Sequence, residues 1–275
     1  MNDRPRSPLI STENLVYEYP GGVRALNGIS LEIYEGEFVA IIGQNGAGKS
    51  TLVKHFNGLL KPTSGRCVIA SKDTRDCKVT ELARVVGYVF QNPDHQIFSE
   101  TIEKEIEFGP KNLGLDKDEV KRRVKEAAEA VGLSDKLDQH PLTLSKGDRQ
   151  RLAIASVMAM RPKAIVIDEP TTGQDYQGGQ QIMSLVTSLH SMGHTLILIS
   201  HNMELVAEYA HRVIVMCGGE ILADGSPAEV FGKPDVLAKT FLEAPQITRI
   251  AQRLQIPETV FSSGRLAEIV LGRGA

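Results

Sequence analysis

The chain has 275 residues, of which 41% are hydrophobic and 24% are charged. These proportions are typical of a globular protein with a sizeable core, either one large α/β domain or one domain with an appendage. The net charge of −3 argues against a nucleic-acid partner, because such surfaces normally carry a basic excess. The three scattered cysteines form no metal-binding spacing, and no apolar run approaches the roughly 18 residues that a membrane span requires. A role at a membrane would therefore need another subunit.

The sequence of the N-terminal part predicts a flexible end followed by strands. Residues 1–11 are mostly polar, contain two prolines and are expected to be flexible. Residues 15–19 alternate like a strand, and Pro-Gly-Gly at 20–22 predicts a turn. Tyr19 or Tyr17 could stack on an adenine ring, although a tyrosine on a strand is more often half-buried packing.

The most informative stretch is an apolar strand at 38–42, followed by a glycine-rich turn and a helix that begins near Lys49. Gly43, Gly48, Lys49 and Ser50 satisfy the phosphate-loop pattern G-x-x-x-x-G-K-[ST]. The glycines let several backbone N–H groups point at one set of phosphates, and the helix N-terminus adds its positive dipole end. Lys49 can reach the β- and γ-phosphates, and the Ser50 hydroxyl can ligate Mg²⁺. The predicted ATP-binding residues of this loop are Gly43, Gln44, Asn45, Gly46, Ala47, Gly48, Lys49, Ser50 and Thr51.

Three further apolar strands end in polar side chains, namely Gln91, the pair Asp168-Glu169, and His201. The carboxyl ends of parallel strands meet at one edge of a doubly wound sheet, so these side chains could converge on one nucleotide. Asp168 suits a Mg²⁺ ligand beside Ser50, Glu169 would polarise the attacking water, and His201 would contact the γ-phosphate. The alternatives are a helix cap for the acids and an ordinary hydrogen-bonded histidine. The phosphate loop weakens both, because it requires a metal ligand and a water-positioning group.

The sequence becomes helical from about 94 to 160. Ser99 is expected to cap a helix that ends at Gly109-Pro110, and the next helix carries apolar residues on one face between 120 and 131. Ser145 and Gly147 precede another apolar helix, where they form an N-cap and a second anion-binding helix end. A helix over 177–191, a hairpin over 213–222 and a capping box at Ser226 follow.

In their order and spacing these motifs resemble the nucleotide-binding subunit of ABC transporters, over residues 10 to 235. The segments that match are an adenine-stacking aromatic (Tyr19), Walker A (43–51), the Q-loop (Gln91), the signature (144–148), Walker B with its glutamate (165–169), the D-loop (172–175) and the switch histidine (His201). The resemblance implies an α/β P-loop NTPase of the ABC ATPase type. Its parts would be a mixed sheet core, an antiparallel β subdomain and an inserted helical subdomain, within a domain at 12–240, and a helical extension at 241–275.

The same resemblance assigns roles to the site residues. Glu169, His201 and Gln91 would be catalytic, ATP would be bound with Mg²⁺, and the Mg²⁺ ligands would be Ser50, Gln91 and Asp168. Four signature residues would contact the ATP of a facing subunit, and Asp175 would belong to the D-loop. Those signature residues are Ser145, Lys146, Gly147 and Asp148.

Residues 91–101 and Phe108-Gly109-Pro110 look like the energy-coupling-factor group and its cobalt-transporter relatives. Those importers combine two ATPase subunits, a transmembrane coupling subunit and a small membrane subunit that captures a vitamin or a metal ion. The resemblance implies a peripheral subunit on the cytoplasmic face of the membrane, paired with itself or with a paralogue. Membrane helices would dock near 91–108, and an apolar stripe of Ile247, Ile250 and Leu254 would help the ATPases to pair.

Two segments depart from the family. The signature usually reads Leu-Ser-Gly-Gly-Gln, whereas this chain has Lys146 and Asp148 at the third and fifth positions. The D-loop has Gln174 where leucine is common. Either change could tune one of two unequal sites, and neither removes a catalytic group.

Three rival functions differ in what they leave unexplained. A small P-loop kinase would have no use for the Ser145 segment or His201. An ABC ATPase of DNA repair would insert a long coiled coil before the signature, and only about ninety residues separate Lys49 from Leu144. A soluble ABC ATPase without a membrane partner is the alternative that the sequence excludes least well.

Overall fold

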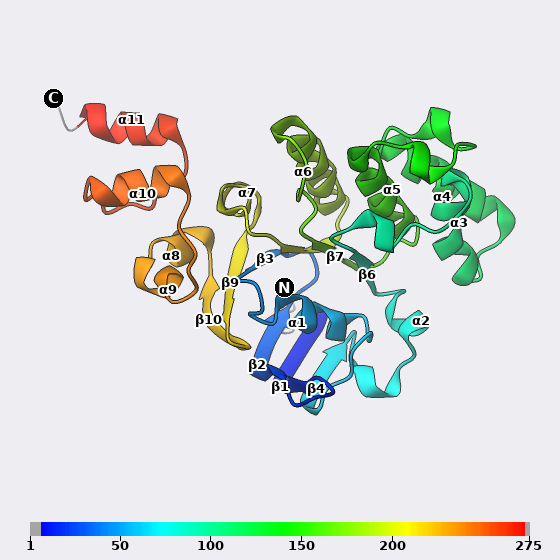
Figure 1. The fold of residues 1–275 in the computed structure, drawn as a ribbon, viewed down its shortest axis with the longest axis horizontal. Coiled ribbons are helices and arrows are strands. Elements are labelled where there is room, and N and C mark those ends of the chain that lie inside the picture. The colour runs from blue at the N-terminus through cyan, green and yellow to red at the C-terminus, as the bar shows by residue number, and fades with distance from the viewer. Residues whose placement is uncertain (1–6, 273–275) are drawn as a thin grey trace, which may run out of the picture.

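In the computed structural model, which describes residues 7–272, a six-stranded sheet of strand order β10-β9-β3-β8-β7-β6 crosses the middle of the molecule (Figure 1). Its strands are β3 (Phe38–Ile42), β6 (Val86–Val89), β7 (Ala164–Asp168), β8 (Thr195–Ile199), β9 (Arg212–Cys217) and β10 (Glu220–Gly225). The first five run parallel, and β10 pairs antiparallel with β9 at the edge. Every residue of β3, β7 and β8 is buried, as expected for apolar strands that are covered on both faces.

Alternate side chains of these strands supply two separate cores. Phe38, Ala40 and Ile42 of β3 point to a core shared with the helices, whereas Val39 and Ile41 point to the opposite face. The helices of the first core include α3 (Ile102–Asn112), α4 (Lys117–Ala130), α5 (Lys146–Met158), α6 (Tyr176–Ser191) and α7 (Met203–Tyr209). The opposite face packs on α1 (Lys49–Phe56) and on a smaller sheet. The mixed sheet with an antiparallel subdomain confirms the predicted fold class.

The smaller sheet is antiparallel and has the order β2-β1-β4-β5. Its strands are β1 (Ile10–Glu18), β2 (Arg24–Ile33), β4 (Ser64–Ile69) and β5 (Lys72–Asp73), and the short α2 (Val79–Leu82) leads on to β6. Leu9 and Ile10 are buried, and β1 pairs with β2 on one side and β4 on the other. The prediction of a flexible end through residue 11 is therefore wrong from Leu9 onward, because two apolar residues there enter the core. Residues 1–6 of that prediction lie outside the described residues.

The helical subdomain lies between β6 and β7, where the sequence predicted it. Its first helix differs from the prediction, because Thr101 and not Ser99 provides the cap, accepting from the backbone N of Lys104 at 3.2 Å. The backbone N of Ser99 instead donates to the buried Glu105 carboxylate at 2.9 Å. The helix also continues past Gly109-Pro110 to Asn112.

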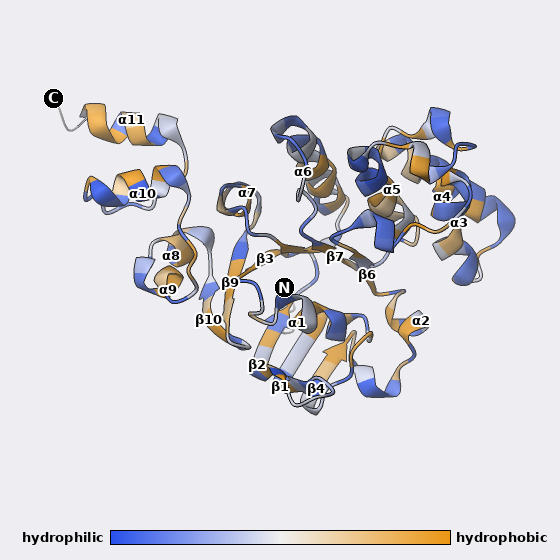
Figure 2. Cartoon of the chain, in the orientation of Figure 1, coloured by the Kyte–Doolittle hydropathy of each residue, from blue (hydrophilic) through white to orange (hydrophobic). Residues whose placement is uncertain are grey.

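The C-terminal part is helical and projects from the rest of the chain (Figure 1). Ser226 and Glu229 form the predicted capping box of α8 (Pro227–Phe231), which is followed by α9 (Pro234–Ala238), α10 (Gln246–Arg253) and α11 (Ser263–Gly272). Ala244 still packs in the main core, so the extension begins at α10, a few residues later than predicted. Figure 2 shows apolar segments on α11. None of the helices between residues 7 and 272 is both long enough and apolar enough to cross a membrane.

Candidate active site

The phosphate loop joins β3 at the centre of the large sheet to α1. Gly43 and Gly48 have φ values of +153° and +100°, which favour glycine. Each also lies close to a neighbouring backbone: a Cβ on Gly43 would be 2.3 Å from the Met216 carbonyl oxygen, and one on Gly48 would be 2.6 Å from that of Ala25. The two glycines therefore let the loop close against β9 and β2.

Lys49 begins α1 and is buried beneath this loop. Its Nζ donates to the carbonyl oxygens of Gly43 and Gln44, at 2.6 and 3.0 Å. Burial lowers the pKa of Lys49, and the carboxylates of Glu169 and Asp168 oppose that shift. A desolvated ammonium at the start of a helix that follows a glycine-rich loop is well placed to receive a phosphate anion.

Asp168 lies at the end of β7, beside the phosphate loop. Its Oδ2 accepts from the Ser50 hydroxyl at 3.1 Å and from the Tyr88 hydroxyl at 2.7 Å. Burial, with Asp168 as the second cause, raises the pKa of Tyr88, so this hydroxyl stays a donor. Sequence reasoning missed Tyr88, and no local pattern marks it, because Tyr88 and Asp168 are 80 residues apart in the chain.

Glu169 follows directly in a left-handed conformation with φ +48°, which is uncommon outside glycine and typical of functional sites. Its backbone N donates to the Ile199 carbonyl oxygen at 2.9 Å, and its Oε2 lies 2.6 Å from Nδ1 of His201. Burial raises the pKa of Glu169, and His201 opposes the shift. The ends of β7 and β8 thus bring two of the predicted catalytic side chains into contact.

A cavity of about 320 Å³ lies beside the phosphate loop and is lined by Tyr19, Val23, Arg24, Ala25 and residues 45–51. The Tyr19 hydroxyl lies 3.0 Å from Oγ1 of Thr51. The Tyr17 ring instead packs edge-on against His55 and joins the core. Of the two tyrosines, Tyr19 is therefore the one placed beside the phosphate loop. Arg24 is a further wall residue that no sequence pattern marked.

Gln91 lies at the exposed end of β6, and no hydrogen bond within residues 7–272 joins it to Lys49, Ser50 or Asp168. The loop that it begins is tied to the helical subdomain by Gln96. The Gln96 side chain accepts from the Phe90 backbone N at 3.1 Å and donates to the Ala153 carbonyl oxygen at 2.8 Å. An ion pair of 2.9 Å between Asp94 and Arg149 adds a second link to α5.

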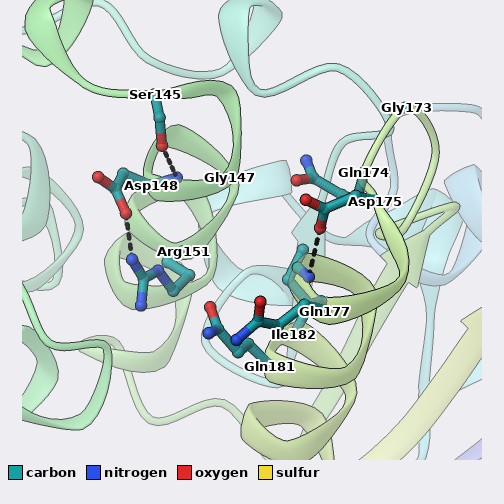
Figure 3. A pocket seen from close by; sticks show the side chains of 11 residues that line it. Ser145, Gly147, Asp148, Arg151, Gly173, Gln174, Asp175, Gln177, Gln181 and Ile182 are labelled. Carbon is teal, nitrogen blue, oxygen red and sulfur yellow. Dashed lines mark hydrogen bonds and ion pairs between the residues drawn. The ribbon is translucent and has the colours of Figure 1, made fainter.

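The signature and the D-loop meet at a different cavity, of about 450 Å³ (Figure 3). Ser145 caps α5 by accepting from the Asp148 backbone N at 3.1 Å, and Asp175 caps α6 by accepting from the Gly178 backbone N at 2.7 Å. Neither residue lines the cavity beside the phosphate loop. Within one chain the two halves of the predicted ATP site are therefore separate.

The Ser50 hydroxyl and the Asp168 carboxylate fit a Mg²⁺ site. Mg²⁺ prefers oxygen ligands and usually takes only one or two carboxylates, completing its shell with water and phosphate oxygens. Among residues 7–272, no three His, Cys, Asp or Glu side chains gather into a protein-only metal site. The pair suits a cation that is held in part by a bound nucleotide.

A phosphate loop, a buried lysine and an acidic strand end on one parallel sheet edge define a P-loop NTPase. The antiparallel sheet and the helical insertion place it among the ABC-type ATPases. A family model for the ABC transporter matches residues 26–172. The chain belongs to the ABC transporter family and is an ATP-binding, ATP-hydrolysing subunit.

Several known proteins are similar over most of this chain. An ABC transporter ATP-binding protein of Caldanaerobacter subterraneus is 49% identical over 246 residues, which are 90% of this chain but only 43% of that protein. The energy-coupling factor transporter ATP-binding protein EcfA2 of Clostridium perfringens is 45% identical, with 95% of this chain and 97% of that protein covered. The solved structure of cbiO1 from Clostridium perfringens, part of the ABC transporter complex cbiONQ, has a TM-score of 0.77 at 38% identity. It covers 90% of this chain and 99% of that chain.

Proposed function

We propose that this chain powers a membrane importer of the energy-coupling-factor type, which takes up a vitamin or a transition-metal ion. The observation that carries the proposal is the division of the site. Lys49, Asp168 and Glu169 gather at one sheet edge, whereas Ser145 opens onto a separate cavity beside the D-loop. Two subunits facing each other would complete both sites. The names of the similar proteins support a transporter as the setting.

In the proposed cycle each ATP binds the phosphate loop of one subunit, with its adenine ring on Tyr19. Ser145 and Gly147 of the facing subunit contact the γ-phosphate, and their helix N-terminus favours that anion. Glu169 orients the attacking water, while His201 holds the Glu169 carboxylate and reaches the γ-phosphate.

Ser50, Asp168 and Gln91 would hold Mg²⁺, which supplies neutralisation of phosphate charge when it is bound. ATP binding would draw the two subunits together, and hydrolysis would release them. Gln91 begins the loop that Gln96 ties to α5, which supports coupling between a bound nucleotide and the helical subdomain.

Two aromatic side chains mark the proposed dock for a membrane subunit. Phe98 is 65% exposed and Phe108 is 47% exposed, and their rings lie edge to face with centroids 4.7 Å apart. The buried Glu105 carboxylate holds this loop by accepting from the backbone N of Phe98 at 3.1 Å. Exposed apolar patches tend to mark partner surfaces, and this one lies just beyond Gln91. Docking here would place the subunit on the cytoplasmic face of the membrane.

The test compares two variants of the assembled transporter in detergent or vesicles. Glu169→Gln should keep ATP binding and lower turnover by about 10²–10⁴, because it preserves size but loses the charge that orients water. Lys49→Ala should act earlier and abolish Mg·ATP binding, because it removes the cation beneath the phosphate loop. Thermal unfolding of each variant is the control for folding.

Near-normal ATPase activity of the Glu169→Gln transporter would contradict the assigned role. A paralogous partner with an intact site could mask the loss, so the corresponding glutamate of both ATPase subunits should be changed together. Measuring Mg·ATP binding to the isolated chain, with and without the Lys49→Ala change, tests the phosphate loop independently of transport.

A further inference from the structure

The two segments in which this chain departs from its family lie against each other. Lys146 is the first residue of α5, and a methyl group placed on Gly173 of the D-loop would lie 2.3 Å from its Nζ. In the reverse direction, a methyl group placed on Gly147 of the signature would lie 3.1 Å from Oε1 of Gln174. Each departing side chain therefore rests on a glycine of the other segment.

Gly173 has two reasons to be glycine. Its φ of +72° is left-handed, and the Lys146 ammonium occupies the space in which a side chain would lie. The Lys146 side chain thus packs in the space that the absent side chain of Gly173 leaves open.

The Gln174 amide lies between the first turns of two helices. Its Oε1 is 3.1 Å from a Cβ built on Gly147 in α5 and 3.2 Å from one built on Gly178 in α6. Helix N-termini carry partial positive charge, so a carbonyl oxygen is favoured there over the leucine side chain that is common in the family. Figure 3 shows Gln174 on the D-loop facing Gly147 across the opening of the cavity.

Asp148, the other departing residue of the signature, is paired with basic residues outside the D-loop. Asp148 forms ion pairs with Lys136 at 3.3 Å and with Arg151. Lys146 is on the same helical turn but extends to the D-loop. The contact with Gly173 therefore belongs to Lys146 alone and is separate from the Asp148 cluster.

We propose that Lys146 and Gln174 latch the signature to the D-loop of the same subunit and act as positioning residues for the shared ATP sites. The inference rests on the proposed function, which assigns both segments to contact with a facing subunit. Because Ser145 and Asp175 cap the two latched helices, displacement of the signature by a nucleotide would move the D-loop as well. Each ATP site would then sense the occupancy of the other.

The first experiment measures amide hydrogen exchange in the full chain without nucleotide. Lys146→Met and Gln174→Ala, singly and combined, should speed exchange of the D-loop amides by roughly threefold or more, because local opening loses a contact. Their effects should be non-additive, as expected for groups that act as one unit. Matched controls are Lys125→Met on the exposed face of α4 and Gln177→Ala on the first turn of α6. Unchanged D-loop exchange in the combined variant, or equal acceleration throughout the chain, would overturn the latch.

The second experiment measures function in the paired ATPases. Mg·ATP affinity of the isolated subunit should be unchanged, while the Hill coefficient for ATP hydrolysis by the assembled pair should fall toward 1. Lys146→Arg should restore the Hill coefficient, because it keeps a long cationic arm. An unchanged Hill coefficient in the combined variant, with exchange accelerated, would overturn the coupling role. If the parent does not pair with ATP at all, the shared sites of the proposed function fail, and the exchange experiment still decides whether the latch exists.

Discussion

At the scale of single residues, the site is built from shared hydrogen bonds. Oδ2 of Asp168 receives two hydroxyl donors, from Ser50 and Tyr88, while Oε2 of Glu169 faces the His201 ring. Both carboxylates are therefore oriented by the protein before any nucleotide binds. A carboxylate that is already oriented loses less conformational entropy when a ligand binds, and the hydrogen bonds from Tyr88 and His201 therefore favour binding.

Removing the Tyr88 hydroxyl tests this orientation of Asp168. Tyr88→Phe keeps the ring in its buried place and removes a hydrogen bond to a charged group, worth about 1.5–3 kcal/mol. We expect the Mg²⁺ concentration for half-maximal nucleotide binding to rise by about tenfold, whereas binding in excess Mg²⁺ is nearly normal. Calorimetric titration of the isolated chain measures both quantities. Tyr34→Phe, which removes an exposed hydroxyl bonded to Glu32, is the matched control, and an unshifted Mg²⁺ dependence would show that Tyr88 only packs.

The pH dependence tests the pairing of Glu169 with His201. Burial raises the pKa of Glu169 above its usual value, and His201 holds that pKa down. In the proposed role of Glu169 the carboxylate is the active form, so turnover should fall as the pH drops through this raised pKa. His201→Gln removes the opposing contribution, so the acidic limb of kcat should move to higher pH, whatever the height of the plateau. A limb that stays in place or moves to lower pH would contradict this assignment.

At the scale of elements, the segment between β6 and α5 is held from two sides. Gln96 fixes its start to the carbonyl oxygen of Ala153, and Glu105 fixes the backbone of Phe98. In the proposed function, movement at the end of β6 would be passed through these contacts to the exposed Phe98–Phe108 pair.

Phe98→Ser tests whether this pair is the membrane dock. The side chain is 65% exposed, so the change should alter the free energy of unfolding by only about 0.5 kcal/mol and leave basal ATPase intact. Co-purification with the membrane subunits from solubilised membranes should drop. Met192→Ser is the matched control, because Met192 is equally exposed and lies just after the end of α6. An unfolded variant would assign Phe98 to packing, and an intact complex would place the dock elsewhere.

At the scale of the whole molecule, the C-terminal extension adds a small separate core. Ala251, Ile256 and Val260 are buried there, with Ile247 packed against them. Ile250 and Leu254 are instead 45% and 51% exposed. The predicted apolar stripe is thus divided, with one residue used inside the extension and two left on its surface.

Changing Ile250 and Leu254 together to Asp tests the proposed pairing role of this surface. We expect weaker association of the ATPase subunits without nucleotide, because two charges would have to lose water at the interface. Sedimentation velocity at matched concentrations measures the association. Leu59→Asp is the control, because Leu59 is an exposed leucine that is distant in sequence from the extension. Unchanged association of the double variant would show that the extension is not part of the interface.

The amino-acid sequence by itself determined the class of this protein, its fold class and its activity as an ATPase. Local patterns sufficed for the phosphate loop, the buried strands β3, β7 and β8, and the capping box of α8, because glycine conformation, continuous apolar runs and helix caps act over a few residues. The order of these motifs along the chain then indicated the family. Boundaries were less well predicted, as the early start of β1 and the cap at Thr101 show.

Only the tertiary structure decided which distant residues meet. Tyr88 and Asp168 are 80 residues apart, Gln96 and Ala153 are 57 apart, and neither contact leaves a pattern in the sequence. The strand pattern alone did not separate Tyr19 from Tyr17, and the resemblance named Tyr19. The structure packs Tyr17 against His55 and places Tyr19 beside the phosphate loop. In the sequence, Lys146 and Gln174 are two separate departures from the family pattern. The fold places Lys146 against Gly173 of the D-loop and Gln174 against Gly147 of the signature. Such contacts depend on sheet order and on how helices pack across it, and these follow from burial over the whole chain rather than from any local stretch.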